Sequence, residues 1–209
     1  MKTLKFIALL LCLQFTTVMN AKPAYIFLAD GVEEVEAVST IDALRRAGMD
    51  VVSVAVGDNN IVTGASGQGL VADSLISEIN FTDANWLIIP GGMPGAPNLH
   101  ASQKVNEVIL NHWNGGGKIA AICAGPAVVL APLGILKDMV ATCFPGSEKN
   151  LTDAGASYEK SPVVVDGHLI TSEGPGTTMQ FAKAIIASEL GRKKADEVLS
   201  AMLVVNDKK

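Results

Sequence analysis

The chain has 209 residues, of which 49% are hydrophobic and 18% are charged, with 16 Lys and Arg against 21 Asp and Glu. A formal net charge of −5, without a basic cluster, argues against nucleic acids and anionic membrane surfaces as partners. Three cysteines are too few for a disulfide-stabilised scaffold.

The first 21 residues have the layout of a secretory signal peptide. Two lysines precede a mostly apolar run over 6–18, and Ala21 supplies a small residue before Lys22. This run is shorter than the roughly 20 residues that span a bilayer. We therefore expect residues 1–21 to be a signal peptide. If this peptide is cleaved, the protein is exported to the periplasm or outside the cell. The alternative is that the segment is not cleaved and serves as a membrane anchor. Loss of Lys2 and Lys5 would change the net charge from −5 to −7.

Residues 22–209 alternate between short apolar runs and amphipathic segments, without a linker or an internal repeat. The pattern predicts strands at 25–29, 50–56, 86–89, 119–122 and 139–143, and helices at 33–47, 102–113, 127–133, 148–154, 177–190 and 193–204. It also predicts a small hairpin over 61–72, a loop at 93–98 and a hairpin at 162–171 around Asp166-Gly167. This order predicts one α/β domain, in which helices cover both faces of a mostly parallel sheet.

Cys123 is the first candidate for chemistry. It follows the predicted strand at 119–122, and Gly125-Pro126 starts a predicted helix directly after it. Such a strand–turn–helix segment is the geometry of a nucleophile elbow, and the nearby helix N-terminus favours a thiolate. The alternative is that Cys123 is a small buried apolar residue, as free cysteines usually are.

Three loops are expected at the same edge of the sheet, because the carboxyl ends of parallel strands lie together. They begin at Asp30, at Pro90 and at Cys123. Glu33 and Glu36, three residues apart, share a helix face, and a glutamate beside the thiol should be partly protonated. The N–H groups of Gly92 and Ala124 are candidate oxyanion donors. The glutamates can also be ordinary helix-start residues, and Gly91-Gly92 an ordinary turn.

Five segments, taken together and in this order, resemble the ThiJ/PfpI superfamily. They extend over nearly all of the chain after the predicted signal peptide: 29–36, 41–48, 90–96, 120–126 and 171–177. The resemblance implies a flavodoxin-like three-layer fold, a homodimer, no cofactor and no metal. It also implies a cytoplasmic location as the usual one for the superfamily.

The resemblance assigns roles to individual residues. Cys123 becomes the reactive, readily oxidised cysteine, with Glu36 as its protonated partner. Gly92 and Ala124 become the backbone donors, and Glu33 and Pro175 line the pocket. Members of the superfamily are described as cofactor-independent glyoxalases, as deglycases that act on early methylglyoxal or glyoxal adducts of proteins or nucleotides, as chaperones and as oxidative-stress sensors.

The chain departs from the superfamily at several pocket positions. Ser66 stands where close relatives carry an arginine, Phe144 precedes the pocket proline Pro145, and Glu173 replaces another arginine. These changes bear on the substrate and on the affinity of the pocket for anions. Cys143 lies beside Phe144. One hypothesis is that Cys123 and Cys143 form a disulfide that acts as a redox switch. The alternative is that the Cys143 thiol lies too far from Cys123 to pair.

The leading functional hypothesis is a glyoxalase/deglycase-type enzyme in which Cys123 attacks a 2-oxoaldehyde and Glu36 moves the proton. The alternative is a non-catalytic oxidation sensor or redox chaperone that uses the same cysteine. A glutamine amidotransferase is disfavoured, because its cysteine needs a histidine and the late His168 is expected at the opposite edge of the sheet. A protease of the same superfamily is disfavoured because Ala124, not histidine, follows Cys123. Asn80 and Asn150 start glycosylation acceptor patterns, which matter only in a eukaryote.

Overall fold

A computed structural model of the protein describes residues 22–204. The predicted signal peptide, residues 1–21, lies outside the described residues. None of the helices within the described part is long and apolar enough to cross a membrane.

The centre of the fold is a seven-stranded sheet in the order β10-β11-β7-β6-β1-β2-β5. All neighbouring pairs are parallel except β10 and β11, which form the predicted antiparallel hairpin at Asp166-Gly167. The inner strands are buried along nearly their whole length, because both faces of the sheet are covered. The strands are β1 Ala24–Leu28, β2 Val51–Ala55, β5 Ser74–Leu75, β6 Trp86–Ile89, β7 Lys118–Ile122, β10 Val163–Asp166 and β11 Leu169–Ser172.

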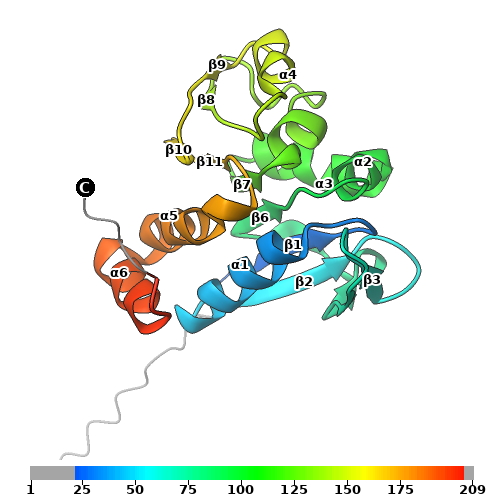
Figure 1. Cartoon of the computed structure of the whole chain (residues 1–209). Helices are drawn as coiled ribbons and strands as arrows, with labels where there is room; N and C mark the ends of the chain where they lie inside the picture. The colour runs from blue at the N-terminus through cyan, green and yellow to red at the C-terminus, as the bar shows by residue number, and fades with distance from the viewer. Residues whose placement is uncertain (1–21, 205–209) are drawn as a thin grey trace, which may run out of the picture.

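Helices form the two outer layers (Figure 1). On one face α1 (Glu34–Arg46) packs against α5 (Thr178–Leu190), which also packs against α6 (Arg192–Ala201). On the other face lie α2 (Gly95–Ala101) and α3 (Gln103–Asn114). This arrangement is the flavodoxin-like three-layer α/β sandwich that the sequence predicts.

Smaller elements surround the sheet. The predicted hairpin at 61–72 is present as two short antiparallel strands, β3 and β4. A second pair, β8 and β9, is parallel and lies with α4 beside the β10–β11 end of the main sheet (Figure 1). Short helical turns fill the connections. The bounds of these elements are β3 Ile61–Thr63, β4 Gly69–Val71, η1 Ile76–Glu78, η2 Phe81–Asp83, η3 Gly125–Leu130, β8 Val140–Ala141, α4 Glu148–Asp153, β9 Ser157–Tyr158 and η4 Pro175–Thr177.

Three segments differ from the sequence-based expectation. The segment 93–98 is not a loop throughout, since α2 begins at Gly95 and contains Pro97 in its first turn, where proline is tolerated. The helix expected at 127–133 starts at Gly125 and is a π-helix, η3. The strand expected at 139–143 is only Val140–Ala141 and pairs with β9, so Cys143 lies beyond it.

Trp86 allows a test of the core. Its ring is fully buried, and its indole Nε1 donates a hydrogen bond of 3.0 Å to Glu189 Oε2. Trp86→Phe removes this donor and part of the buried ring, so we expect the free energy of unfolding in urea to fall by about 2–3 kcal/mol. The matched control is Trp113→Phe, in a half-buried ring that stacks on His168 with 4.3 Å between centroids. We expect this control to lose less than about 1 kcal/mol; equal losses would contradict the assignment of Trp86 to the core.

Candidate active site

The three predicted loops meet at the carboxyl edge of the central strands. The Glu33 N–H, after β1, donates to the carbonyl of Gly91, after β6, at 3.2 Å. The N–H of Gly91 in turn donates to Glu36 Oε2 on α1, at 2.7 Å. Cys123 follows β7 at the same edge and contacts Glu36. The topology therefore brings a thiol and a carboxyl group together from segments 87 positions apart in the chain, from residue 36 to residue 123.

Cys123 occupies a constrained turn. Its φ of 61° lies in the left-handed region, which residues other than glycine adopt rarely. Two hydrogen bonds of 2.9 Å fix its backbone: the Cys123 N–H donates to the carbonyl of Ser172, and the Phe144 N–H donates to the carbonyl of Cys123. Its side chain is only 9% exposed. This is the conformation expected of a nucleophile elbow.

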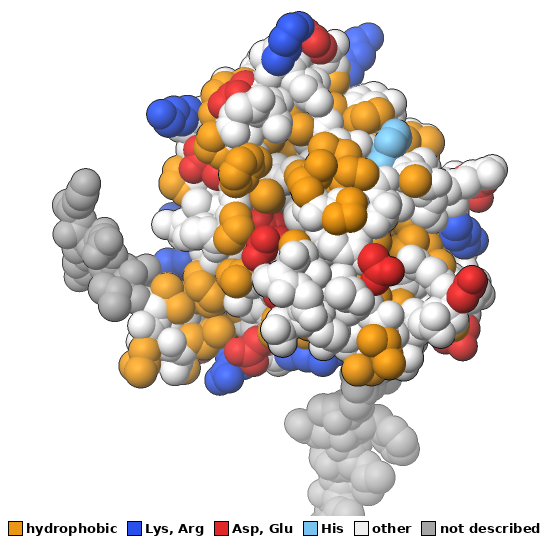
Figure 2. Space-filling view, turned by 45° about the vertical axis from the view of Figure 1, so that its right-hand side comes forward, with side chains coloured by type: hydrophobic (Ala, Val, Ile, Leu, Met, Phe, Trp, Pro, Cys, Tyr) orange, Lys and Arg blue, Asp and Glu red, His pale blue; other side chains and the backbone are white. Residues whose placement is uncertain are grey.

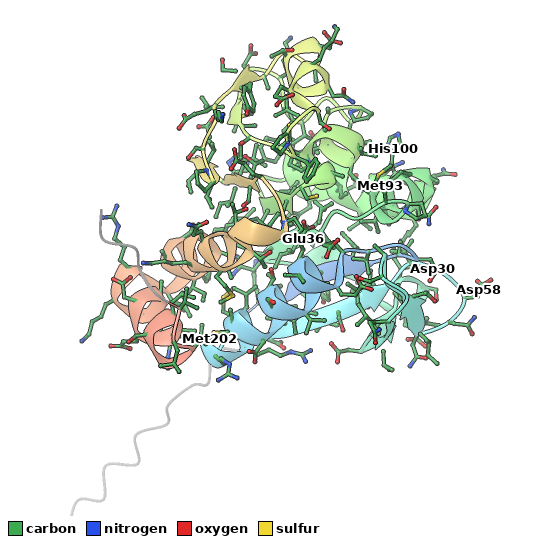
Figure 3. The ribbon with its side chains drawn as sticks, viewed as in Figure 1. Asp30, Glu36, Asp58, Met93, His100 and Met202 are labelled. Atoms are coloured by element: carbon green, nitrogen blue, oxygen red, sulfur yellow. The ribbon has the colours of Figure 1, made fainter. Side chains whose placement is uncertain are left out.

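Glu36 is a fully buried carboxyl group, with 0% exposure. Figure 3 shows its side chain near the centre of the molecule, above α1. One oxygen, Oε2, accepts from Gly91 N–H, whereas Oε1 is buried without a hydrogen-bond partner among the described residues. The Cys123 thiol lies close enough to this carboxyl group to lower its pKa. Burial raises the pKa of Glu36 to about 7, and the negative charge of Glu33 contributes in the same direction. Glu36 is therefore protonated much more readily than an exposed glutamate.

The pKa of Cys123 moves in the direction opposite to our expectation. Burial and the neighbouring Glu36 carboxylate raise the pKa of the thiol to about 12. The N–H groups of Gly92 and Ala124, the two predicted donors, hydrogen-bond the sulfur and lower its pKa by less. The thiol and the carboxyl group thus titrate as one unit, in which the first proton leaves near neutral pH and the second is retained to alkaline pH.

Gly91 is a functional position that sequence reasoning missed. A Cβ at residue 91 would lie 2.7 Å from Cys123 Cβ and 2.9 Å from Cys123 Sγ, closer than real Cβ contacts. Glycine therefore lets the sulfur sit against this loop while the Gly91 N–H holds Glu36. The pair Gly91-Gly92 directly after a buried strand was the signal, but we expected only Gly92 to contribute.

The remaining predicted pocket residues lie at the same edge. Glu33 is half-buried at the start of α1, close enough to act on Glu36. Pro175 begins η4 after β11 and is half-buried. Ser66 does not face the thiol in place of the missing arginine; its N–H and its hydroxyl donate to Glu34 at 2.8 and 2.9 Å. This contact, which sequence reasoning also missed, attaches the hairpin of β3 and β4 to α1.

Cys143 is a second free thiol and is fully buried. Burial and the charges of Glu148 and Glu173 raise its pKa to about 12. Its neighbour Phe144 donates to the Cys123 carbonyl, so the two cysteine segments touch through the backbone. The thiols are nevertheless unpaired in this structure, and their pairing stays a prediction.

His112 and His168 lie away from the thiol. The His112 ring contacts the carbonyl of Lys118, the first residue of β7, at 3.0 Å, whereas Cys123 follows the last residue of that strand. Five residues of strand separate these positions by about 16 Å. His168 precedes β11 at the same far edge. Within residues 22–204, no three His, Cys, Asp or Glu side chains are grouped as metal ligands.

The mouth of the site is apolar and acidic. Met93 and Phe144 are 64% and 46% exposed, and Glu173 follows the strand beside Cys123. Figure 2 shows the face that carries α2 and the β3–β4 hairpin, with hydrophobic and acidic side chains at its centre and basic ones at its margin. No cation is among the groups that shift the pKa of Glu36 or Cys123. The site offers backbone N–H groups, not lysine or arginine, to a developing negative charge.

Comparison with known proteins identifies the family of the chain. The model of the DJ-1/PfpI family matches residues 22–188. Protein DJ-1 homolog B of Arabidopsis thaliana is 41% identical over 177 residues, which cover 85% of this chain and 40% of that protein. The chain thus spans less than half the length of this plant relative. The protein named glutathione-independent glyoxalase DJR-1.2 of Caenorhabditis elegans is 35% identical over 182 residues, covering 87% of this chain and 96% of that protein.

Solved structures give the same result. The structure titled Toxoplasma gondii DJ-1, oxidized, superimposes with a TM-score of 0.85 at 35% identity, covering 89% of this chain and 100% of that chain. The family match likewise extends over most of the chain. The chain therefore belongs to the DJ-1/PfpI family.

Proposed function

We propose that the protein is a cofactor-independent glyoxalase/deglycase-type enzyme, a hydro-lyase or hydrolase. Its substrates would be methylglyoxal, glyoxal or their early adducts on proteins and nucleotides. The observation that carries this proposal is the contact between the Cys123 thiol and the buried Glu36 carboxyl group, beside two N–H donors. The name of the nematode relative, a glutathione-independent glyoxalase, supports the same class of reaction.

The first step is the addition of the sulfur to an aldehyde. Transfer of the shared proton to Glu36 leaves Cys123 as a thiolate, which forms a C–S bond to the aldehyde carbon of methylglyoxal. The carbonyl oxygen becomes an alkoxide, beside the N–H groups of Gly92 and Ala124, and takes the proton from Glu36 to give a hemithioacetal, which returns Glu36 to its carboxylate form. Because these donors are backbone groups, they need no reorganisation during the reaction.

Glu36 then moves a proton between two carbons. As a carboxylate it removes the proton from the former aldehyde carbon, which gives an enediol, and it returns a proton to the neighbouring carbon. The product is a thioester of lactate on Cys123. Water attacks the thioester carbonyl, the C–S bond breaks, and lactate leaves while the sulfur regains its proton. The net reaction adds one water to methylglyoxal and consumes no cofactor.

The charge at the mouth favours neutral substrates. Glu33 is close enough to raise the pKa of Glu36, and the charge of Glu173 acts on the adjacent Cys143. Negative side chains at this position repel carboxylates and phosphates, so we propose that free 2-oxoaldehydes and adducts on cationic side chains are preferred over anionic 2-oxoacids.

The second candidate is an oxidation sensor or redox chaperone. It is favoured by the same two N–H donors, which suit sulfinate oxygens on Cys123 as well as an alkoxide, and by the oxidised state named for the Toxoplasma relative. Catalytic turnover separates the two candidates.

We also propose a homodimer through α1 and the β3–β4 hairpin. Val35 and Val38 on α1 are 49% and 48% exposed, and Ile61 and Val71 on the hairpin are 64% and 70% exposed. The contact of Ser66 with Glu34 joins these two elements into one surface. Exposed apolar side chains that gather in one patch are typical of interfaces.

The catalytic roles predict a clear order of activities. Cys123→Ala should form no lactate from methylglyoxal, because it lacks the nucleophile. Glu36→Gln should lose about 10²- to 10⁴-fold in kcat/KM, since its amide cannot move the proton. The matched control, Cys143→Ala, removes the other buried thiol and should retain activity. Formation of lactate by Cys123→Ala would refute the mechanism. If the wild type forms no lactate but carries sulfinate on Cys123 after mild peroxide treatment, the oxidation sensor is favoured instead.

The shared proton predicts how activity depends on pH. Below the raised pKa of Glu36, about 7, both groups carry protons and no thiolate is available. We therefore expect kcat/KM to rise with pH through this value and to be lost as the pH falls below it. Glu36→Gln should abolish this inflection in the residual activity. The same inflection in both proteins would show that another group controls the reaction.

The dimer proposal is tested by charge substitution. Val38→Glu places a carboxylate in the proposed interface and should convert the dimer into a monomer in analytical ultracentrifugation. Val165→Glu, on the edge strand β10 at 56% exposure, is the matched control and should leave the dimer intact. A wild-type protein that sediments as a monomer, or a Val38→Glu protein that stays dimeric, would overturn the proposed interface.

A further inference from the structure

A cavity of about 570 Å³ lies at the edge of the sheet opposite to Cys123. One wall is a face of α3, formed by residues spaced at helical intervals: Lys104, Val108, Asn111 and His112. The other walls are the segment 79–85 before β6, the glycines 115–117 and the start of β7, with Lys22 beside them. Its volume is in the range of small-molecule sites, and it shares no residue with the proposed active site.

The charges around this cavity are positive. Lys22, Lys104 and Lys118 line it, and its lining contains no Asp or Glu, although the chain as a whole carries a net charge of −5. Among the described residues, Lys22 and Lys104 take part in no ion pair, whereas Lys118 pairs with Glu189 at 2.7 Å. The adjacent carboxyl group of Asp83 accepts a hydrogen bond from Tyr25.

The ring of His112 is held between two backbone carbonyl groups. Its Nε2 lies 3.0 Å from the Lys118 oxygen, and the Asn85 carbonyl is a second partner. Gly117 is required here, because a Cβ at this position would overlap the ring. A neutral imidazole has one N–H and satisfies one of the two carbonyl groups, whereas the imidazolium satisfies both.

The surroundings of His112 nevertheless oppose its protonation. Burial lowers its pKa, and the neighbouring His168 and Lys22 act in the same direction. The other charged groups nearby are Lys104 on its own helix, and Lys118 on β7, which Glu189 of α5 neutralises. The two carbonyl groups favour the imidazolium form of His112, whereas burial and the nearby cations favour the neutral form. A negative charge added nearby would therefore shift this equilibrium towards the imidazolium.

We propose that this cavity binds a small anionic ligand, through a phosphate-like or carboxylate group near Lys22 and Lys104, and that binding adds a proton to His112. The side chains of Ile79, Phe81 and Val108 provide an apolar wall for the rest of such a ligand. The bound anion offsets the cations that oppose the imidazolium, which then donates to both carbonyl groups. Affinity is therefore highest at low pH and falls as the pH rises through the pKa of His112 in the complex.

The first test uses sulfate and acetate as probes, because neither changes its protonation near neutral pH. The His112 ring signals are followed by NMR in each salt, against sodium chloride at the same ionic strength. We expect one or both probes to shift these signals and to raise the His112 pKa beyond the effect of chloride. The stronger probe distinguishes a phosphate-like from a carboxylate ligand. Shifts equal to those in chloride would overturn the proposal.

The second test assigns the binding groups by calorimetry with the stronger probe. Lys22→Gln and Lys104→Gln should each weaken binding by up to about fivefold, the upper end of the range for one exposed charge pair. Lys193→Gln, on the exposed face of α6, makes the same change in net charge outside the cavity and should have no effect. His112→Gln should retain binding but lose its pH dependence. Equal weakening by Lys193→Gln, or an unchanged pH dependence in His112→Gln, would contradict the proposed site.

Discussion

The structure of the site depends on one interaction, the contact between the Cys123 thiol and the buried carboxyl group of Glu36. Burial alone would keep both groups protonated. Because the two groups lie close enough to shift each other's pKa, loss of one proton leaves a single negative charge on the pair. The Gly91 N–H stabilises that charge on Glu36, and the N–H groups of Gly92 and Ala124 stabilise it on the sulfur. Near neutral pH the pair is singly ionised, and moving its remaining proton from the sulfur to Glu36 supplies the thiolate that the proposed mechanism needs.

The fold supplies this pair through its parallel sheet. The adjacent strands β1, β6 and β7 end at one edge, and each contributes one part: the helix that carries Glu36, the glycine loop, and Cys123 itself. Glycine at 91 allows the loop to approach the sulfur. The left-handed turn at Cys123 is fixed by hydrogen bonds from two further segments. The opposite edge of the same sheet carries the basic cavity, so the two sites are separated by the length of β7.

Much of this arrangement could be predicted from local sequence. The strand, the cysteine and Gly125-Pro126 predict the elbow. The spacing of Glu33 and Glu36 predicts one shared helix face, but α1 begins at Glu34 and Glu33 precedes it in an extended conformation. The direction in which the Cys123 pKa shifts could not be predicted in this way, because the shift depends on burial. A helix N-terminus stabilises a negative charge by about 0.3–1 kcal/mol, less than the combined effect of burial and the Glu36 carboxylate, which raises this pKa from 9.0 to about 12. The cavity around His112 joins three distant segments and has no sequence signature.

The most direct test of the coupling is the rate at which iodoacetamide alkylates Cys123 as a function of pH, measured in Cys143→Ala with and without Glu36→Gln. With Glu36 present, we expect two steps, one near neutral pH and one at alkaline pH. With glutamine at position 36, we expect a single step below the alkaline one, because the carboxylate that raises the thiol pKa is gone. Identical curves for the two proteins would contradict a shared proton and, with it, the proposed mechanism.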